Sequence, residues 1–149
     1  MIQTVDLTYA GTEKMVETVH ISVNRQGLHS ITGQIESVVS SSGITSGLCT
    51  LFVQHTSASL LIQENADPSA QYDLERWLNR LVPENDKMYT HTCEGPDDMP
   101  AHIKSAITAT SLSIPIINSA LGLGVWQGIY LWEHRHAQTR RQVLVHVGG

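Results

Sequence analysis

Apolar and polar positions alternate near the start of the chain, a pattern typical of strands with one buried face. One alternating stretch covers residues 5–9 and a second covers residues 19–23. The turn-prone pair Gly11–Thr12 lies between them. The pattern therefore predicts a β-hairpin.

Two later segments carry apolar residues at helical spacing. The first lies between Ser30 and Ser40 and is followed by Gly43, a helix stop signal. The second covers Pro68–Val82, where Asp67 can cap the free amides and the proline fits the first turn. Each segment is predicted to be a helix with one buried face.

A polar stretch, Pro83–Asp98, follows the second predicted helix and is too long to be a simple connector. Either acid of the pair 97–98 can cap a third helix with Pro100 in its first turn. The spacing of apolar residues places Ile103, Ala106 and Ile107 on one face of this helix. Long ordered loops in compact domains often carry function, so this stretch is a candidate functional segment.

The remaining apolar segments are typical of strands: Leu48–Val53, Leu60–Ile62, Leu112–Ile117, Gly124–Trp132 and Gln142–Val147. The short polar connection His134–Thr139 predicts a hairpin turn between the last two. Because helices lie between groups of strands, we expect an α+β fold with a largely antiparallel sheet or sandwich and a few packed helices. Residues 1–149 contain no repeat or linker, so one domain is expected.

Composition narrows the class of protein. Fourteen acidic and nine basic residues give a formal net charge of −5, which argues against a general nucleic-acid binder. The two cysteines have neither disulfide-framework nor zinc-knuckle spacing, so a reducing cytoplasm is expected. No basic leader is present, and no apolar run approaches the roughly 20 residues of a membrane helix, so we expect a soluble protein without a membrane partner.

Eight histidines stand beside a single phenylalanine, and polar residues gather in three segments. The first is Gln54–Pro68, where His55, Thr56 and Ser57 interrupt two predicted strands. Hydroxyl and amide donors of this kind can surround an anion such as phosphate. The alternative is that they satisfy backbone groups at a turn.

The second segment, Tyr89–His102, holds two imidazoles and three carboxylates within fourteen residues. A zinc site with an open position needs about three protein ligands. His91 and His102, with a third residue brought by folding, would suffice. In the alternative interpretation these residues bind no metal: His102 is a residue of the first helical turn, and the acids cap the helix or lie in a solvated loop.

The third segment, Trp126–Arg141, holds three of the nine basic residues together with Glu133. An arginine can bind phosphate through two hydrogen bonds. Glu133 and Arg141 are the stronger candidates, whereas the neighbouring histidines and Arg140 are expected to form surface pairs on a charged turn. The chain lacks both a GxSxG nucleophile elbow and a dinucleotide fingerprint, which argues against acyl transfer and nucleotide-cofactor chemistry.

The order and spacing of these segments resemble the YjbQ family, which is also labelled as secondary thiamine-phosphate synthase enzymes. The resemblance covers nearly the whole chain and rests on FVQHTSASLLIQENADP, DLERWLNRLVPEND, YTHTCEGPDDMPAHIKSAI, LGLGVWQGIYLWEHR and RRQVLVHVGG. It implies an α+β subunit of a homotrimer, with a polar pocket near subunit interfaces that takes an anion and a metal.

The labelled reaction couples hydroxymethylpyrimidine diphosphate to thiazole phosphate and releases pyrophosphate. The resemblance implies an enzyme that binds a divalent metal, either zinc, which imidazoles favour, or magnesium, which diphosphates favour. The implied metal ligands are His55, His91 and His102; the anion-binding residues are Thr56, Ser57, Asn65, Gln127 and Arg141; the catalytic residues are Glu64, Asp98 and Glu133. Two alternatives stay open: a metal-dependent hydrolase of a small phosphorylated metabolite, and a non-catalytic trimer that binds or senses an anion.

Overall fold

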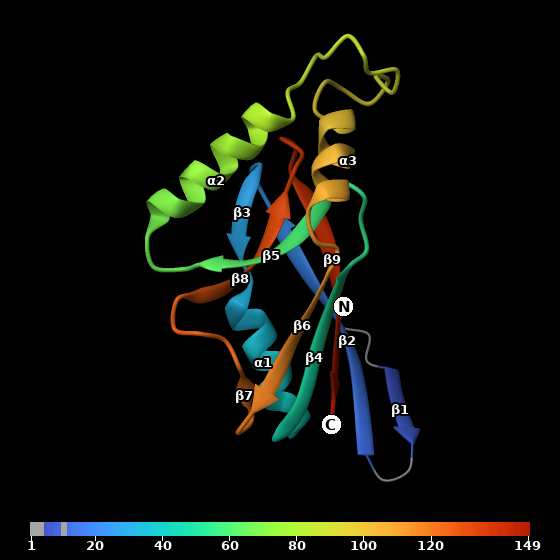
Figure 1. Ribbon diagram of the computed structural model, residues 1–149. Coiled ribbons are helices and arrows are strands. Elements are labelled where there is room, and N and C mark those ends of the chain that lie inside the picture. Colours follow the sequence, from blue (N-terminus) through green and yellow to red (C-terminus); the bar gives the residue numbers. More distant parts are fainter. Residues whose placement is uncertain (1–4, 10–11) are drawn as a thin grey trace.

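The computed structural model describes residues 5–9 and 12–149 (Figure 1). An antiparallel pair comes first, β1 (Val5–Tyr9) and β2 (Thr12–Val23), in which Val5 lies opposite Val16. The predicted hairpin is therefore confirmed. Of the predicted turn pair, Gly11 lies outside the described residues, and Thr12 is the first residue of β2.

The described strands form two antiparallel sheets. The other strands are β3 (Gly27–Ser30), β4 (Ser46–Val53), β5 (Ala58–Glu64), β6 (Ser111–Ile117), β7 (Ala120–Leu121), β8 (Gln127–Glu133) and β9 (Thr139–Gly148). The larger sheet has the order β1-β2-β9-β4-β6-β7, and the smaller has the order β3-β8-β5. The predicted α+β class with largely antiparallel pairing is confirmed.

Two connections carry the chain from one sheet to the other. β4 belongs to the larger sheet and β5 to the smaller one, so the segment 54–57 crosses between them. β8 and β9 are likewise in different sheets, and the prediction of a hairpin turn between them is wrong. The last residue of β8, Glu133, pairs with Ala58 of β5 instead, a non-local choice that the polarity pattern does not encode.

The predicted strand from Gly124 to Trp132 also starts later than expected, at Gln127. The backbone N–H of Gln127 donates to the Gly124 carbonyl, and the Gly124 N–H donates to the Gln127 side chain. These two bonds close a turn before the strand begins.

The first two predicted helices are confirmed. Helix α1 (Thr32–Ser42) ends at Gly43, whose φ of 71° lies in the left-handed region that favours glycine. Helix α2 (Pro68–Leu81) begins with Asp67 as cap, because its carboxylate accepts the Ser69 N–H at 2.9 Å. Local signals were sufficient to place both helices.

The predicted third helix is confirmed as α3 (Asp98–Ile107), but the face that carries Ile103, Ala106 and Ile107 is not its buried face. Ala106 and Ile107 are exposed and Ile103 is only half-buried, whereas the buried positions are Asp98, Pro100, Ala101, Lys104 and Ser105. Polar contacts explain this orientation. The ammonium of Lys104 donates to the side-chain oxygen of Asn79 at 2.5 Å, so a charged residue can point inward while isoleucine faces solvent.

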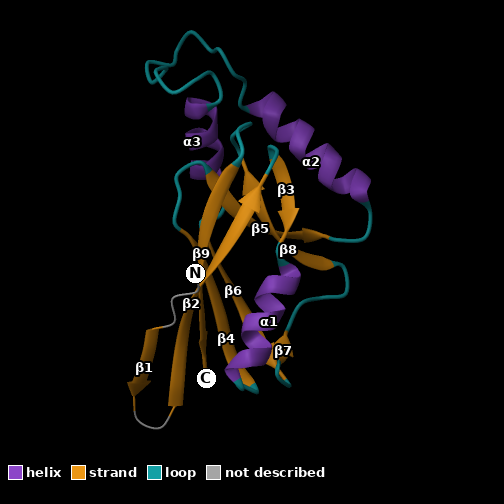
Figure 2. Ribbon diagram, turned by 180° about the vertical axis from the view of Figure 1, so that it is seen from behind, coloured by secondary structure: helices purple, strands orange, loops and turns teal. Residues whose placement is uncertain are grey.

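The helices lie on different parts of the sheets. Helix α1 packs against one face of the larger sheet, while α2 and α3 lie near the end opposite β1 and β7 (Figures 1 and 2). Among the described residues, no helix covers the other face of the larger sheet, which carries Leu48, Phe52 and Leu144. None of the described helices is long and apolar enough to span a membrane.

Helix packing can be tested with two identical substitutions. Ile35 is fully buried in the core under α1, whereas Ile107 of α3 is 55% exposed. We expect Ile35→Ala to lower the free energy of unfolding by about 2–5 kcal/mol, since it removes buried methyl groups and leaves a cavity. Ile107→Ala should lower it by less than about 1 kcal/mol. Urea unfolding measures both values, and equal losses would contradict the observed orientation of α3.

Candidate functional site

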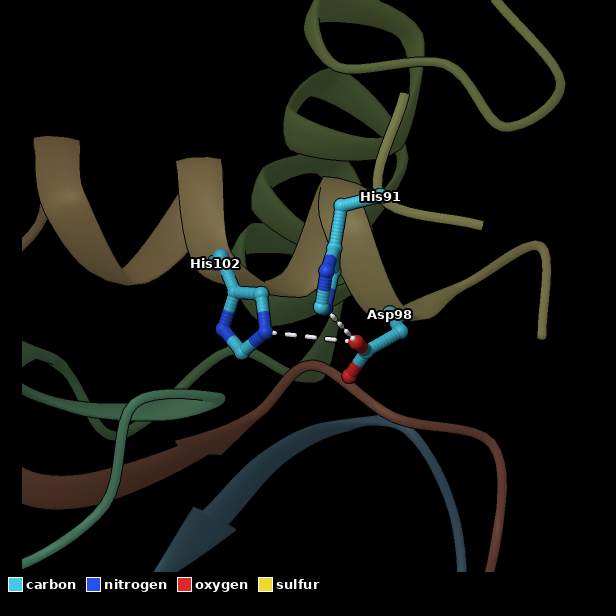
Figure 3. A group of neighbouring side chains, drawn as sticks. All are labelled: His91, Asp98 and His102. Carbon is cyan, nitrogen blue, oxygen red and sulfur yellow. Dashed lines mark hydrogen bonds and ion pairs between the residues drawn. The ribbon is translucent and has the colours of Figure 1, made fainter. Parts of the chain in front are cut away.

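Two imidazoles and one carboxylate meet at the start of α3 (Figure 3). His91 comes from the loop between α2 and α3, whereas Asp98 and His102 lie one helical turn apart on α3. Asp98 Oδ2 is 2.8 Å from His91 Nε2 and 3.2 Å from His102 Nε2. The Asp98 side chain is only 2% exposed, but that of His91 is 50% exposed, so the group opens to solvent on one side.

The ring orientation of His102 fixes where its proton lies. His102 Nδ1 is 3.0 Å from the carbonyl oxygen of Thr56, and a carbonyl can only accept, so Nδ1 carries the hydrogen. In the neutral ring, Nε2 then directs its lone pair at the Asp98 carboxylate. Two acceptors this close repel each other unless positive charge lies between them, supplied by a second proton on the ring or by a metal ion.

These donors suit a transition metal. Two imidazole nitrogens and a carboxylate oxygen, all within 4.8 Å of one another, match the ligand types of zinc and similar ions. Zinc bonds of about 2.1 Å in a tetrahedron separate ligand atoms by about 3.4 Å, so a small outward movement would suffice. Magnesium prefers oxygen ligands and fits this set less well.

His55 is not part of this group. Its Nε2 accepts the backbone N–H of Gln142 at 2.8 Å, which ties the crossover after β4 to β9. Partial burial, and then the nearby Arg141 guanidinium, lower the pKa of His55 and favour its neutral form. The third member of this group is Asp98, which we expected to act as a catalytic or orienting group, and not His55, which the family resemblance implied as a metal ligand.

A buried ion pair lies beside the group. Arg141 donates to both carboxylate oxygens of Glu133, through Nε at 2.6 Å and Nη2 at 2.5 Å. The Thr139 hydroxyl and the Arg135 backbone N–H also donate to this carboxylate, and Arg141 donates to the Ser57 hydroxyl at 2.9 Å. Ser57, Glu133 and Arg141 therefore satisfy one another. A phosphate would have to displace these contacts to bind Arg141.

Three other predicted site residues, Glu64, Asn65 and Gln127, form a second group at the end of the β5–β8 ladder away from Glu133. Glu64 lies opposite Gln127, whereas Ala58, at the other end of the ladder, lies opposite Glu133. Six residues of strand separate the two ends by about 20 Å. Asn65 donates through its side chain to the Gln127 carbonyl, at 3.2 Å. Within one chain, the predicted site residues thus occupy two separate places.

Arg135 is a site residue that sequence reasoning missed. Its guanidinium donates to Asp98 Oδ1 at 2.6 Å, and its Nε lies 3.1 Å from Asp97 Oδ2. In the sequence it is one of three arginines near a turn. Asp97 and Asp98 are adjacent acids, and their two negative charges favour a nearby cation. The sequence does not show which arginine lies close to them.

His134 is another unexpected case, since we predicted a surface histidine on a charged turn. It is 1% exposed, and its Nε2 is 2.9 Å from the Ser59 hydroxyl. Burial, followed by the nearby charges of Lys104 and Arg141, lowers the pKa of His134 to about 3. This histidine is therefore neutral and structural.

Comparison with known proteins identifies the family. The sequence pattern described as "UPF0047 protein YjbQ-like" matches residues 17–149. A UPF0047 protein of Synechocystis sp. is 54% identical over 133 residues, covering 89% of this chain and 90% of that protein. The UPF0047 protein YjbQ of Escherichia coli O157:H7 is 43% identical over 127 residues, covering 84% and 91%. The chain belongs to the YjbQ family.

Solved structures share the YjbQ fold described above. A protein of Sulfolobus solfataricus, described as YbjQ-like and of unknown function, superimposes with a TM-score of 0.85 at 24% identity. It covers 93% of this chain and 99% of its own. The Thermus thermophilus protein TT1486 gives a TM-score of 0.75 at 35% identity, covering 87% and 98%.

The neutral His134 makes the stability of this YjbQ protein depend on pH. The ordinary histidine pKa is 6.5, so below pH 6.5 the His134 side chain is protonated in the unfolded chain. In the native state it stays neutral down to about pH 3. This contribution to stability is complete above pH 6.5 and falls by about 1.4 kcal/mol per pH unit on acidification. In His134→Gln and His134→Phe, the unfolding free energy should fall less steeply between pH 6.5 and 4.5, by about that slope. Urea unfolding at several pH values measures this, and slopes parallel to wild type would contradict it.

Proposed function

We propose that this protein is a divalent-metal-dependent enzyme that acts on a small phosphorylated metabolite, with His91, Asp98 and His102 as its metal ligands. The observation that carries the proposal is the orientation of His102. Its Nδ1 lies 3.0 Å from the Thr56 carbonyl oxygen and donates to it, so Nε2 is the ring atom that faces the buried Asp98 carboxylate. A metal ion between Nε2 and the carboxylate oxygen would bond to both.

The chain's own residues hold and orient the ligands. A hydrogen bond to the distal ring nitrogen fixes the tautomer of a metal-binding histidine, as the Thr56 carbonyl does for His102. When bound, the ion would neutralise phosphate charge or lower the pKa of a water molecule. The half-exposed His91 leaves a side of the group open from which a substrate can approach.

The specific reaction we propose is coupling of hydroxymethylpyrimidine diphosphate to thiazole phosphate. It is supported by the family resemblance and by the need to stabilise a departing diphosphate. Arg135 and Arg141 already bind carboxylates, so the metal would supply most of the positive charge. Hydrolysis of a phosphorylated metabolite is the second candidate, because the open side of the group also admits water.

Metal content and product analysis test this proposal. Protein purified without an affinity tag should carry about one zinc-class ion per chain, and chelation should abolish turnover. His91→Ala and His102→Ala should lower both metal affinity and turnover by at least about 100-fold, because each removes a ligand. His29→Ala serves as a control, since His29 bonds only to the Arg25 carbonyl among the described contacts.

The products separate the candidate reactions. Thiamine phosphate and pyrophosphate formed only when both substrates are present would support coupling. Phosphate or pyrophosphate released without the thiazole partner would support hydrolysis. Binding of an anion without turnover would favour a sensor, and metal content and turnover that survive both histidine substitutions would rule out the proposed centre.

We further propose that the subunits associate as a homotrimer with shared sites. Leu48 and Phe52 are 43% and 48% exposed on the face of the larger sheet turned away from α1, and Leu144 lies opposite Phe52. Exposed apolar surface of this kind is typical of subunit contacts. A neighbouring subunit could also bring its Glu64 and Gln127 group to the metal ligands, which lie at the other end of the β5–β8 ladder within one chain.

Subunit association can be measured directly. Sedimentation should give three times the monomer mass of 16.4 kDa. Phe52→Asp should shift the protein towards monomers, because it buries a charge in the proposed contact, whereas Val125→Asp, at a 79% exposed position, should not. If sites are shared, a refolded mixture of inactive His102→Ala and Gln127→Ala chains should regain part of the activity. A monomeric wild type would refute this assembly.

A further inference from the structure

Arg135, in the crossover between β8 and β9, makes several contacts with the segment that leads into α3. Arg135 donates through Nη1 to Asp98 Oδ1 at 2.6 Å and through Nη2 to the Glu94 carbonyl at 2.8 Å. Its Nε lies 3.1 Å from Asp97 Oδ2. One planar guanidinium thus contacts both the end of the loop that carries His91 and the first residue of α3.

The two oxygens of Asp98 have different partners. Oδ1 accepts the short, charge-assisted bond from Arg135, whereas Oδ2 faces the two imidazoles. The side chain is 2% exposed, so it has little room to rotate. Arg135 therefore holds one oxygen away from the His91 and His102 rings and leaves the other directed at them.

Arg135 also connects this group to the buried ion pair. Its backbone N–H donates to Glu133 Oε1 at 3.0 Å, and Glu133 binds Arg141, which binds the Ser57 hydroxyl. The neighbouring Thr56 accepts the hydrogen bond from His102, and His102 faces Asp98. The contacts close a ring from Asp98 through both crossovers and back. Both supports of the proposed ligands, the guanidinium and the Thr56 carbonyl, are thus fixed relative to each other.

We propose that Arg135 is a positioning residue that restricts Asp98 to binding the metal through one oxygen, which keeps a coordination position open for a phosphate oxygen of the substrate. This inference rests on the metal centre of the proposed function. Without the guanidinium, Oδ1 loses its charge-assisted bond and becomes free to bind the same ion. A two-oxygen carboxylate would add a fourth protein ligand atom beside the position that a catalytic zinc site keeps for water or substrate, and would crowd that position.

Cobalt(II) is a suitable probe, because its visible spectrum reports coordination number without any turnover. We expect the cobalt-loaded wild-type protein to show the intense bands of a four-coordinate site and to change its spectrum on addition of inorganic phosphate. In Arg135→Gln the band intensity per bound cobalt should fall about twofold or more, as a fifth ligand atom enters. The phosphate concentration needed for half of the spectral change should rise about tenfold or more.

Two further variants guard against a purely structural effect. Arg135→Lys keeps the charge but not the planar fork, so its spectrum should lie between wild type and Arg135→Gln. It also serves as the deciding variant if the glutamine protein does not fold, as judged by circular dichroism. Arg25→Gln is the matched control, because the half-exposed Arg25 also pairs with a carboxylate, that of Glu75 in α2 at 3.3 Å, and belongs to neither crossover. It should leave the cobalt spectrum and the phosphate response unchanged.

The outcomes separate this inference from the metal centre itself. If wild type and both Arg135 variants show the same band intensity and the same phosphate response, Arg135 does not control how Asp98 binds, although the metal centre stands. If wild type binds no cobalt, or if His91→Ala and His102→Ala keep the wild-type spectrum, the proposed metal centre is contradicted. The proposed role of Arg135 is then contradicted as well.

Discussion

The buried pair of Glu133 and Arg141 is the interaction on which the rest of the structure depends. Glu133 ends β8 of the smaller sheet, whereas Arg141 lies in β9 of the larger one, so their contact joins the two sheets. Removing two charges from water is costly, and a buried pair is stable only when further hydrogen bonds complete its geometry. Here the carboxylate accepts two such bonds, from the Thr139 hydroxyl and the Arg135 backbone N–H, beside the two from Arg141, and Arg141 also donates to Ser57 of the other crossover. The pair thus fixes the place where the chain changes sheet twice.

This junction, the contact between the two sheets at Glu133 and Arg141, explains why polar side chains lie together at one end of the molecule. Both crossovers end there, and α3 begins beside them, so side chains distant in sequence become neighbours. The stabilising pair uses two of the predicted site residues, Glu133, which was expected to be catalytic, and Arg141, which was expected to bind an anion. In our proposal His91, Asp98 and His102, which lie beside this junction, carry the function. The ion pair itself has a structural role.

Local signals predicted the parts of the structure that depend on neighbouring residues. The caps and stop signals of α1 and α2 are contained in a few adjacent positions, and His91, Asp98 and His102 lie within one loop and helix. Pairing between distant strands is different: nothing in the β8 sequence shows that it pairs with β5 and not with β9. For the same reason, Arg135 was missed and Gln127 was grouped with residues about 20 Å away. The buried face of α3 does not follow from its apolar spacing, because Lys104 finds a partner, Asn79, in another helix.

The position of β9 has a consequence for how the chain reaches this fold. β9 follows every other described strand in the sequence, yet it lies between β2 and β4. Until β9 is in place, β2 and β4 each have an unpaired edge next to the apolar core. Such edges can recruit strands from other molecules, and pairing across long sequence separations is slow. A nascent or unfolded chain of this protein therefore has two strand edges open to aggregation for as long as β9 is not in place.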